Sequence, residues 1–165
     1  MKPPPIPWEQ ATATEPLLRQ EIPATFLDAN NHLNIRFYMH LFDDAGDVLA
    51  AQLGLTREYH DAHHTGGMDL EHHLHYLREV REGETVALYT RVIGVTEKRW
   101  HYILFLVNAT RQEVAATFEC VNTFVDMTIR KTAPLPPFIR ERIKERIEAD
   151  RTPGWEPPLC GMMSA

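Results

Sequence analysis

The fold is decided by Leu27-Asp28-Ala29-Asn30-Asn31-His32-Leu33-Asn34, a polar run that is followed at once by an apolar segment. Asp and Asn are favoured in tight turns and at the N-terminal caps of helices. The pattern therefore predicts a turn that opens a long helix over residues 34–55, ended by Gly54. This places the carboxylate of Asp28 beside a helix N-terminus, where backbone N–H groups are free and carry partial positive charge.

The apolar residues of the predicted helix cover more than one stripe of its surface. Ile35, Tyr38, Phe42, Leu49 and Leu53 are among them, and they do not fit a single narrow face. A surface helix would show one apolar stripe only. We therefore expect the helix to be surrounded on several sides by other elements.

The rest of the chain reads mainly as strands. Gly66-Gly67 is expected to break the chain, and β-branched and aromatic runs separated by short polar turns follow. The short connections favour an antiparallel meander. The expected strands are residues 17–26, interrupted by Pro23, and then 68–79, 85–96, 100–108 and 114–125, before a charged helix over 138–149.

This order predicts an α+β domain in which a curled antiparallel sheet wraps one long central helix. We divide the chain into an irregular Pro-rich arm (1–16), one domain (17–150) and a C-terminal tail (151–165). Such a sheet has unpaired edges, and pairing between subunits would satisfy them. We therefore expect a homodimer or a dimer of dimers.

Composition excludes several classes of protein. The chain has 165 residues and a formal net charge of -6, and 44% of its residues are hydrophobic. One folded domain is expected, without the basic surface typical of nucleic-acid or anionic-membrane binding. Cys120 and Cys160 do not form a disulfide framework, and no apolar run resembles a signal or membrane-spanning segment. A cytoplasmic location is the simplest interpretation.

The chain resembles the hotdog-fold acyl-CoA thioesterases of the 4-hydroxybenzoyl-CoA thioesterase type. The run 28–34 is similar to the family's Asp-x-x-Gly-His-Val-Asn turn, and Tyr38 and Phe42 follow at family-like positions. The segment 76–86 resembles the family's strand, Gly-acidic turn and strand. Asn31 stands where the family usually has Gly, in a position that we expect to be left-handed and therefore tolerant of Asn.

The resemblance implies hydrolysis of an acyl-CoA thioester without a cofactor or metal. Asp28 would attack the thioester carbonyl or activate a water, and the sequence does not decide between these roles. Backbone N–H groups near Asn34 and Ile35 would hold the oxyanion. His32 could orient Asp28 or contact the thioester, but we favour a structural role in which its imidazole bonds a backbone group.

Further residues are candidates for binding the substrate. Glu71 and His73 share one face of their strand and could line an acyl pocket between subunits, although exposure explains them equally well. Basic residues could meet the phosphates of coenzyme A or could simply be solvated. The full set of substrate-binding candidates is Asn31, Tyr38, Glu71, His73, Lys98, Arg99 and Arg130.

Two alternatives remain open at this point. The chain could be a non-catalytic module that binds acyl-CoA, or its histidines at 60, 63, 64, 72, 73 and 75 could bind zinc. The acyl group could be aromatic, aliphatic or cationic. The polar, acidic and His-rich segment 59–75 hints at a polar or cationic group, such as the trimethylammonium of betainyl-CoA.

Overall fold

The computed structural model describes residues 5–151 and 154–165. The strands form one antiparallel sheet in the order β1-β3-β4-β5-β2, with β6 beside β5. The strands are β1 (Leu18–Glu21), β2 (Thr65–Tyr76), β3 (Thr85–Val95), β4 (Arg99–Asn108), β5 (Glu113–Asp126) and β6 (Lys131–Thr132). The helices are α1 (Trp8–Ala11), the 3-10 turn η1 (Ala24–Phe26), α2 (Ile35–Gln52), α3 (Arg57–His63) and α4 (Pro137–Asp150).

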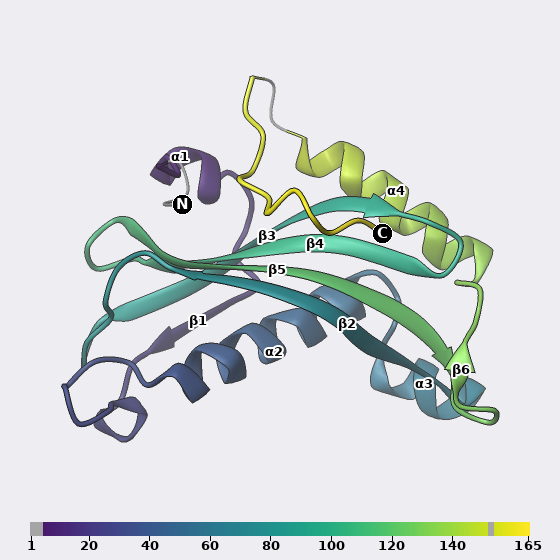
Figure 1. The fold of residues 1–165 in the computed structure, drawn as a ribbon, viewed down its shortest axis with the longest axis horizontal. Helices are drawn as coiled ribbons and strands as arrows, with labels where there is room; N and C mark the ends of the chain where they lie inside the picture. The colour runs from purple at the N-terminus through teal and green to yellow at the C-terminus, as the bar shows by residue number, and fades with distance from the viewer. Residues whose placement is uncertain (1–4, 152–153) are drawn as a thin grey trace.

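Helix α2 lies along one face of the curled sheet, as Figure 1 shows. Its buried residues recur at helical spacing, from Tyr38 and Phe42 to Ala45 and Leu49. The rings of Phe42 and Phe118 of β5 stack with their centroids 5.0 Å apart. This is the expected hotdog arrangement. The opposite side of α2 remains exposed, so the expectation that the helix is surrounded on several sides is wrong.

The other face of the sheet is covered by the two ends of the chain (Figure 1). Trp8 and Ala11 of α1 and Trp155 of the tail pack against a second apolar cluster that includes Ile103 and Phe105. The arm predicted to be irregular thus contains one helical turn. Polar contacts fix the tail, because the carboxylate of Glu119 accepts a hydrogen bond of 2.7 Å from the backbone N–H of Cys160.

The two edges of the sheet differ. Along β3, strand β1 pairs with one end and helix α4 contacts the remainder. There, the buried carboxylate of Asp150 in α4 accepts a hydrogen bond of 2.8 Å from the N–H of Val92. Along β2, one side pairs with β5 and, within residues 5–151 and 154–165, no strand pairs with the other. Met68 and Leu70 on this edge are 55% and 45% exposed.

The strand β2 departs from expectation in two ways. It begins at Thr65, so Gly66 and Gly67 lie inside the strand rather than breaking the chain. Its pairing with β5 also shifts between Asp69 and Glu71, which leaves Leu70 as a bulge. A bulge re-aims the side chains around it. Among the described residues, no helix is long and apolar enough to cross a membrane.

Candidate active site

The turn before α2 is built around the carboxylate of Asp28. Its Oδ1 accepts hydrogen bonds from the backbone N–H groups of Asn30 (2.8 Å) and His32 (3.2 Å). Leu27 and Leu33 form a bridge that closes the turn. The N–H groups of His32 and then Asn30 hold the pKa of Asp28 below its ordinary value of 3.8. Asp28 is therefore a carboxylate at neutral pH.

The backbone of Asn31 has a φ of 59°, in the left-handed region. A family-type Gly adopts this conformation freely, and Asn is the residue that tolerates it next best. The expectation that this position is left-handed is confirmed. Asn31 therefore adopts the left-handed backbone that a Gly in the motif would adopt.

The imidazole of His32 points to a neighbour that the sequence did not suggest. Its Nε2 lies 2.7 Å from Oε2 of Glu79, in the connection between β2 and β3. The ring thus ties the turn to the sheet through a side chain, whereas we expected a bond to the backbone. Both hydrogen bonds to the Asp28 carboxylate end on Oδ1, and Oδ2 accepts none from the described residues.

The helix start offers one free backbone donor. The N–H of Asn34 is occupied, because it donates to the carbonyl of Phe26 (2.9 Å). The N–H of Arg36 donates to the capping Oδ1 of Asn34 (3.1 Å). Among the described residues, the N–H of Ile35 has no such partner. Of the two donors expected from the sequence, only Ile35 is therefore available for a ligand.

Asp28 and Ile35 open into a cavity of about 470 Å³, which we call the helix-start cavity. Tyr38 and Tyr76 meet edge to face there, with ring centroids 5.0 Å apart. Burial, followed by nearby acidic groups, raises the pKa of Tyr38 to about 12, so its phenol stays neutral. The lining residues are Asp28, His32, Leu33, Asn34, Ile35, Tyr38, Tyr76, Leu77, Arg78 and Glu79.

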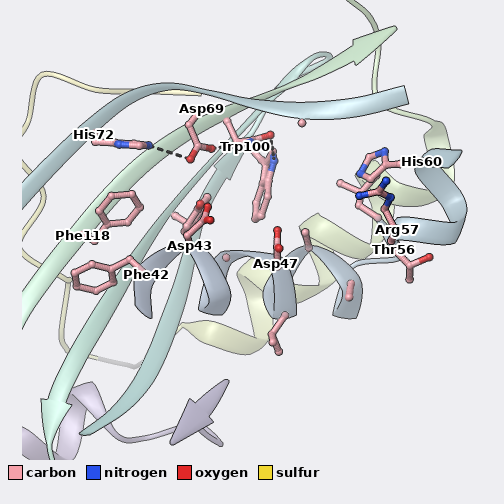
Figure 2. A pocket seen from close by; sticks show the side chains of 18 of the residues that line it. Phe42, Asp43, Asp47, Thr56, Arg57, His60, Asp69, His72, Trp100 and Phe118 are labelled. Carbon is pink, nitrogen blue, oxygen red and sulfur yellow. Dashed lines mark hydrogen bonds and ion pairs between the residues drawn. The ribbon is translucent and has the colours of Figure 1, made fainter. Parts of the chain in front are cut away.

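A second cavity of about 600 Å³ lies between the middle of α2 and strand β2, and we call it the mid-helix cavity. Figure 2 shows Asp43 and Asp47 pointing from α2 towards β2, and Asp69 pointing from β2 towards the helix. Trp100 stands between them. The sequence analysis missed this cavity, although the spacing of Asp43 and Asp47 puts both on one side of the helix.

The structure does not bring the remaining predicted residues to these cavities. Glu71 and His73 pair with Val121 and Glu119, and Glu119 binds the tail on the outer face. Because side chains of paired positions point to the same side, Glu71 and His73 face away from α2. They therefore do not line a pocket against α2 in this chain.

The predicted basic residues are also far from Asp28. Lys98 and Arg99 lie at the β3–β4 turn, and Arg130 lies between β5 and β6. Figure 1 shows this end of the sheet opposite the start of α2. Within one chain, these side chains and Asp28 therefore belong to different ends of the domain.

The histidines are dispersed over several contacts. His60 bonds Thr65, His63 bonds the carbonyl of Tyr59, and His73 contacts His75. Among the described residues, the group with metal-ligand spacing is Asp69, His72 and Cys120, whose ligand atoms lie within 4.8 Å of one another. Burial raises the pKa of the Cys120 thiol well above its ordinary range, which favours the protonated form.

Comparison with known proteins identifies the family. The model of the Thioesterase-like superfamily matches residues 22–143. The betainyl-CoA thioesterase of Pseudomonas aeruginosa is 32% identical over 126 residues, which cover 76% of this chain and 79% of that protein. The L-carnitine dehydrogenase/betainyl-CoA thioesterase of Rhizobium meliloti is 27% identical over 128 residues, or 78% of this chain and 26% of that longer protein.

Solved structures agree on the fold. A hypothetical protein from Staphylococcus aureus in complex with CoA superposes with a TM-score of 0.81 at 22% identity, covering 90% of this chain and 93% of that one. The 1,4-dihydroxy-2-naphthoyl-CoA thioesterase from Synechocystis gives a TM-score of 0.69 at 11% identity, covering 78% and 94%.

The chain belongs to the thioesterase-like superfamily. Its enzyme class is acyl-CoA thioesterase, and both the hotdog fold and this class, expected from the resemblance, are confirmed.

The hydrogen bonds to Asp28 predict how its carboxyl titrates. We expect carbon-detected NMR to give a pKa below 3.8 in the folded protein. A lowered pKa means that the turn gains stability from ionised Asp28 above the ordinary value. This stability is lost as the pH falls through the lowered pKa. A measured pKa at or above the ordinary value would contradict the two N–H contacts.

Proposed function

We propose that Asp28 is the catalytic residue in the hydrolysis of an acyl-CoA thioester, and that it acts as nucleophile or as general base. The supporting observation is a carboxylate oxygen without a partner beside the free N–H of Ile35, in an open cavity. As base, Asp28 takes a proton from a water that adds to the carbonyl. As nucleophile, it forms an acyl anhydride that water then cleaves. In both routes the C–S bond breaks, and the products are a carboxylic acid and CoA thiol.

The oxyanion formed at the carbonyl carries a full negative charge and needs a donor. The N–H of Ile35 at the first helical position supplies one, supported by the positive end of the α2 dipole. A carboxylate, a water and a backbone amide are sufficient for this chemistry, so we propose that the reaction uses neither a cofactor nor a metal. His32 then acts by holding the turn on Glu79 rather than by proton transfer.

A short cationic acyl group is the substrate that we favour. Two relatives are named as betainyl-CoA thioesterases, and the segment 59–75, which covers most of α3 and β2, is rich in acidic and imidazole groups. The betainyl nitrogen is separated from the thioester carbonyl by one methylene group, so both must be held close together.

The two cavities of one chain are too far apart for such a short group. Asp43 lies eight residues beyond Ile35 on α2, which is about 12 Å along the helix axis. A betainyl group that reached Asp28 could therefore not also reach Asp43 of the same chain. The geometry requires either different ligands for the two cavities or a second copy of the chain.

We propose that two copies pair along their free β2 edges. Antiparallel pairing would place the Tyr76 end of one strand beside the Thr65 end of the other. Asp28 of each copy would then lie next to the mid-helix cavity of its partner. The same pairing would bring Lys98, Arg99 and Arg130 towards the partner's site, where they could meet the phosphates of CoA.

The exposed apolar side chains of β2 support this pairing, because a long bare edge otherwise invites aggregation. In solution we therefore expect a particle of about twice the 19.0 kDa subunit mass, or a multiple of it, by light scattering. A particle with the mass of one subunit would contradict the pairing. A cytoplasmic location, expected from the sequence, remains part of this proposal.

Thiol release from a panel of acyl-CoAs tests the role of Asp28. We expect Asp28→Asn to lower kcat/KM by about 100- to 10,000-fold, because the amide can neither take a proton nor attack the carbonyl. The amide oxygen can still accept the N–H groups of Asn30 and His32, so the circular-dichroism spectrum should be unchanged.

Other outcomes favour the alternatives. A folded wild type that binds acyl-CoA without releasing thiol would support the non-catalytic binding module. Activity that is lost with a chelator and restored by zinc would support the metal-binding interpretation. An Asp28→Asn variant as active as wild type would leave the thioesterase class intact and remove Asp28 from the reaction.

A further inference from the structure

The mid-helix cavity is lined by both acidic and aromatic side chains. Asp43 and Asp47 project into it from α2 and Asp69 from β2, with Trp100 of β4 between them (Figure 2). Tyr102, also of β4, lines the cavity and stacks on Trp100, and we call these two rings its floor. Nothing in the proposed hydrolysis uses these side chains. Carboxylates beside aromatic rings attract cations and repel anions.

The negative charge of this cavity is only partly neutralised within the described residues, because His72, which also lines the cavity, places its Nε2 3.0 Å from Oδ2 of Asp69. Asp43 and Asp47 make no hydrogen bond or ion pair with the described residues, whereas their neighbour Asp44 contacts His40 at 3.7 Å. Burial, followed by Asp43, Asp44 and Asp69, raises the pKa of Asp47. Each of these carboxylates thus opposes the ionisation of Asp47, and a bound cation would relieve that repulsion.

The other two basic groups of the lining, Arg57 and His60, do not offset the charge of Asp43 and Asp47. The guanidinium of Arg57 is engaged by Asp61, with Nε 3.0 Å from both carboxylate oxygens. Burial lowers the pKa of His60, which favours its neutral form. A ligand entering the cavity therefore meets a net negative lining.

The aromatic floor is held rigidly. Trp100 and Tyr102 stack with their centroids 4.6 Å apart. The indole N–H of Trp100 donates to Asn122 (2.9 Å), and the amide of Asn122 donates in turn to Asp69 (2.6 Å). This chain of hydrogen bonds fixes the ring and one carboxylate relative to each other.

A glycine keeps the cavity open on its helical side. Gly46 stands between the two acidic residues of α2, and a Cβ at that position would lie 3.4 Å from the phenol oxygen of Tyr102. A larger side chain would fill the space in front of the ring. Gly46 thus leaves this space open at a helix position where glycine otherwise lowers stability.

We propose that the mid-helix cavity binds the quaternary ammonium group of the acyl chain, with Asp43 and Asp47 facing the cation and Trp100 and Tyr102 beneath it. This inference rests on the proposed function, including the β2 pairing that places the cavity of one copy beside Asp28 of the other, because it names the part of the enzyme that selects the acyl group. A trimethylammonium ion is weakly hydrated and donates no hydrogen bonds, so charge and aromatic faces are the groups that recognise it.

A matched pair of substrates tests the assignment. Betainyl-CoA and 3,3-dimethylbutanoyl-CoA have the same shape. They differ at one atom, which is a positively charged nitrogen in the first and a neutral carbon in the second. We expect wild type to prefer the cation by at least about tenfold in kcat/KM, since each nearby carboxylate favours it by Coulomb attraction. Asp43→Asn and Asp47→Asn should each lower this preference by roughly threefold to tenfold, mainly through KM.

Asp44→Asn is the matched control, because it removes a carboxylate from the same helix outside the cavity lining. It should leave the preference within about twofold of wild type. Glycine betaine binding, measured by calorimetry, gives a second readout that needs no turnover. It should weaken in the Asp43 and Asp47 variants and not in the Asp44 variant.

The outcomes separate this inference from the proposed function. If both thioesters are hydrolysed with equal kcat/KM, the enzyme is a thioesterase and the cation site is wrong. The cation site is also wrong if the Asp43 and Asp47 variants keep the wild-type preference. If neither thioester is hydrolysed but glycine betaine binds as described, the cation site stands and the proposed function fails. Zinc binding that depends on Asp69 and excludes glycine betaine would assign the cavity to a metal and overturn the inference.

Discussion

The packing of α2 on the concave face of the sheet is the constraint on which the rest of the molecule depends. Phe42 against Phe118, together with the neighbouring buried positions of the helix, fixes the rotation of α2 about its axis. Once that rotation is fixed, the helix N-terminus must emerge beside the end of β2, where Asp28 lies. The same rotation turns Asp43 and Asp47 towards β2. One apolar contact surface therefore positions both the Asp28 turn and the charged cavity.

Because of this packing, the start and the middle of α2 contribute different groups. The helix start provides the carboxylate and the free N–H, and the middle provides the acidic and aromatic walls. A short acyl group cannot span both within one chain, but β2 ends at the first site and passes over the second. The free edge of β2 is thus the element through which two copies could join the halves of a site. The outer face, in contrast, is already covered by α1, Trp155 and the tail.

The sequence predicted much of the fold because the decisive signals are local. The turn at Asp28, the helix after it and the antiparallel strands each follow from neighbouring residues, and Asn31 could be read as left-handed from its place in the motif. The mid-helix cavity was missed because five elements (α2, α3, β2, β4 and β5) contribute to it, so no single segment of the sequence contains its pattern. The side of the sheet to which Glu71 and His73 point, and the bulge at Leu70, depend on how β2 pairs with β5. Local β-propensity does not predict that pairing.

Subunit mixing tests the central claim of a site shared between two copies. Asp28→Asn lacks the carboxylate that we propose to react, and the Asp43→Lys, Asp47→Lys double variant should reject betainyl-CoA. After denaturation and refolding together in equal amounts, half of the dimers should be mixed, and each mixed dimer would contain one intact site. The account predicts recovery of about a quarter of the wild-type activity on betainyl-CoA from two variants that are inactive alone. No recovery, with mixed dimers shown to form, would contradict the shared site.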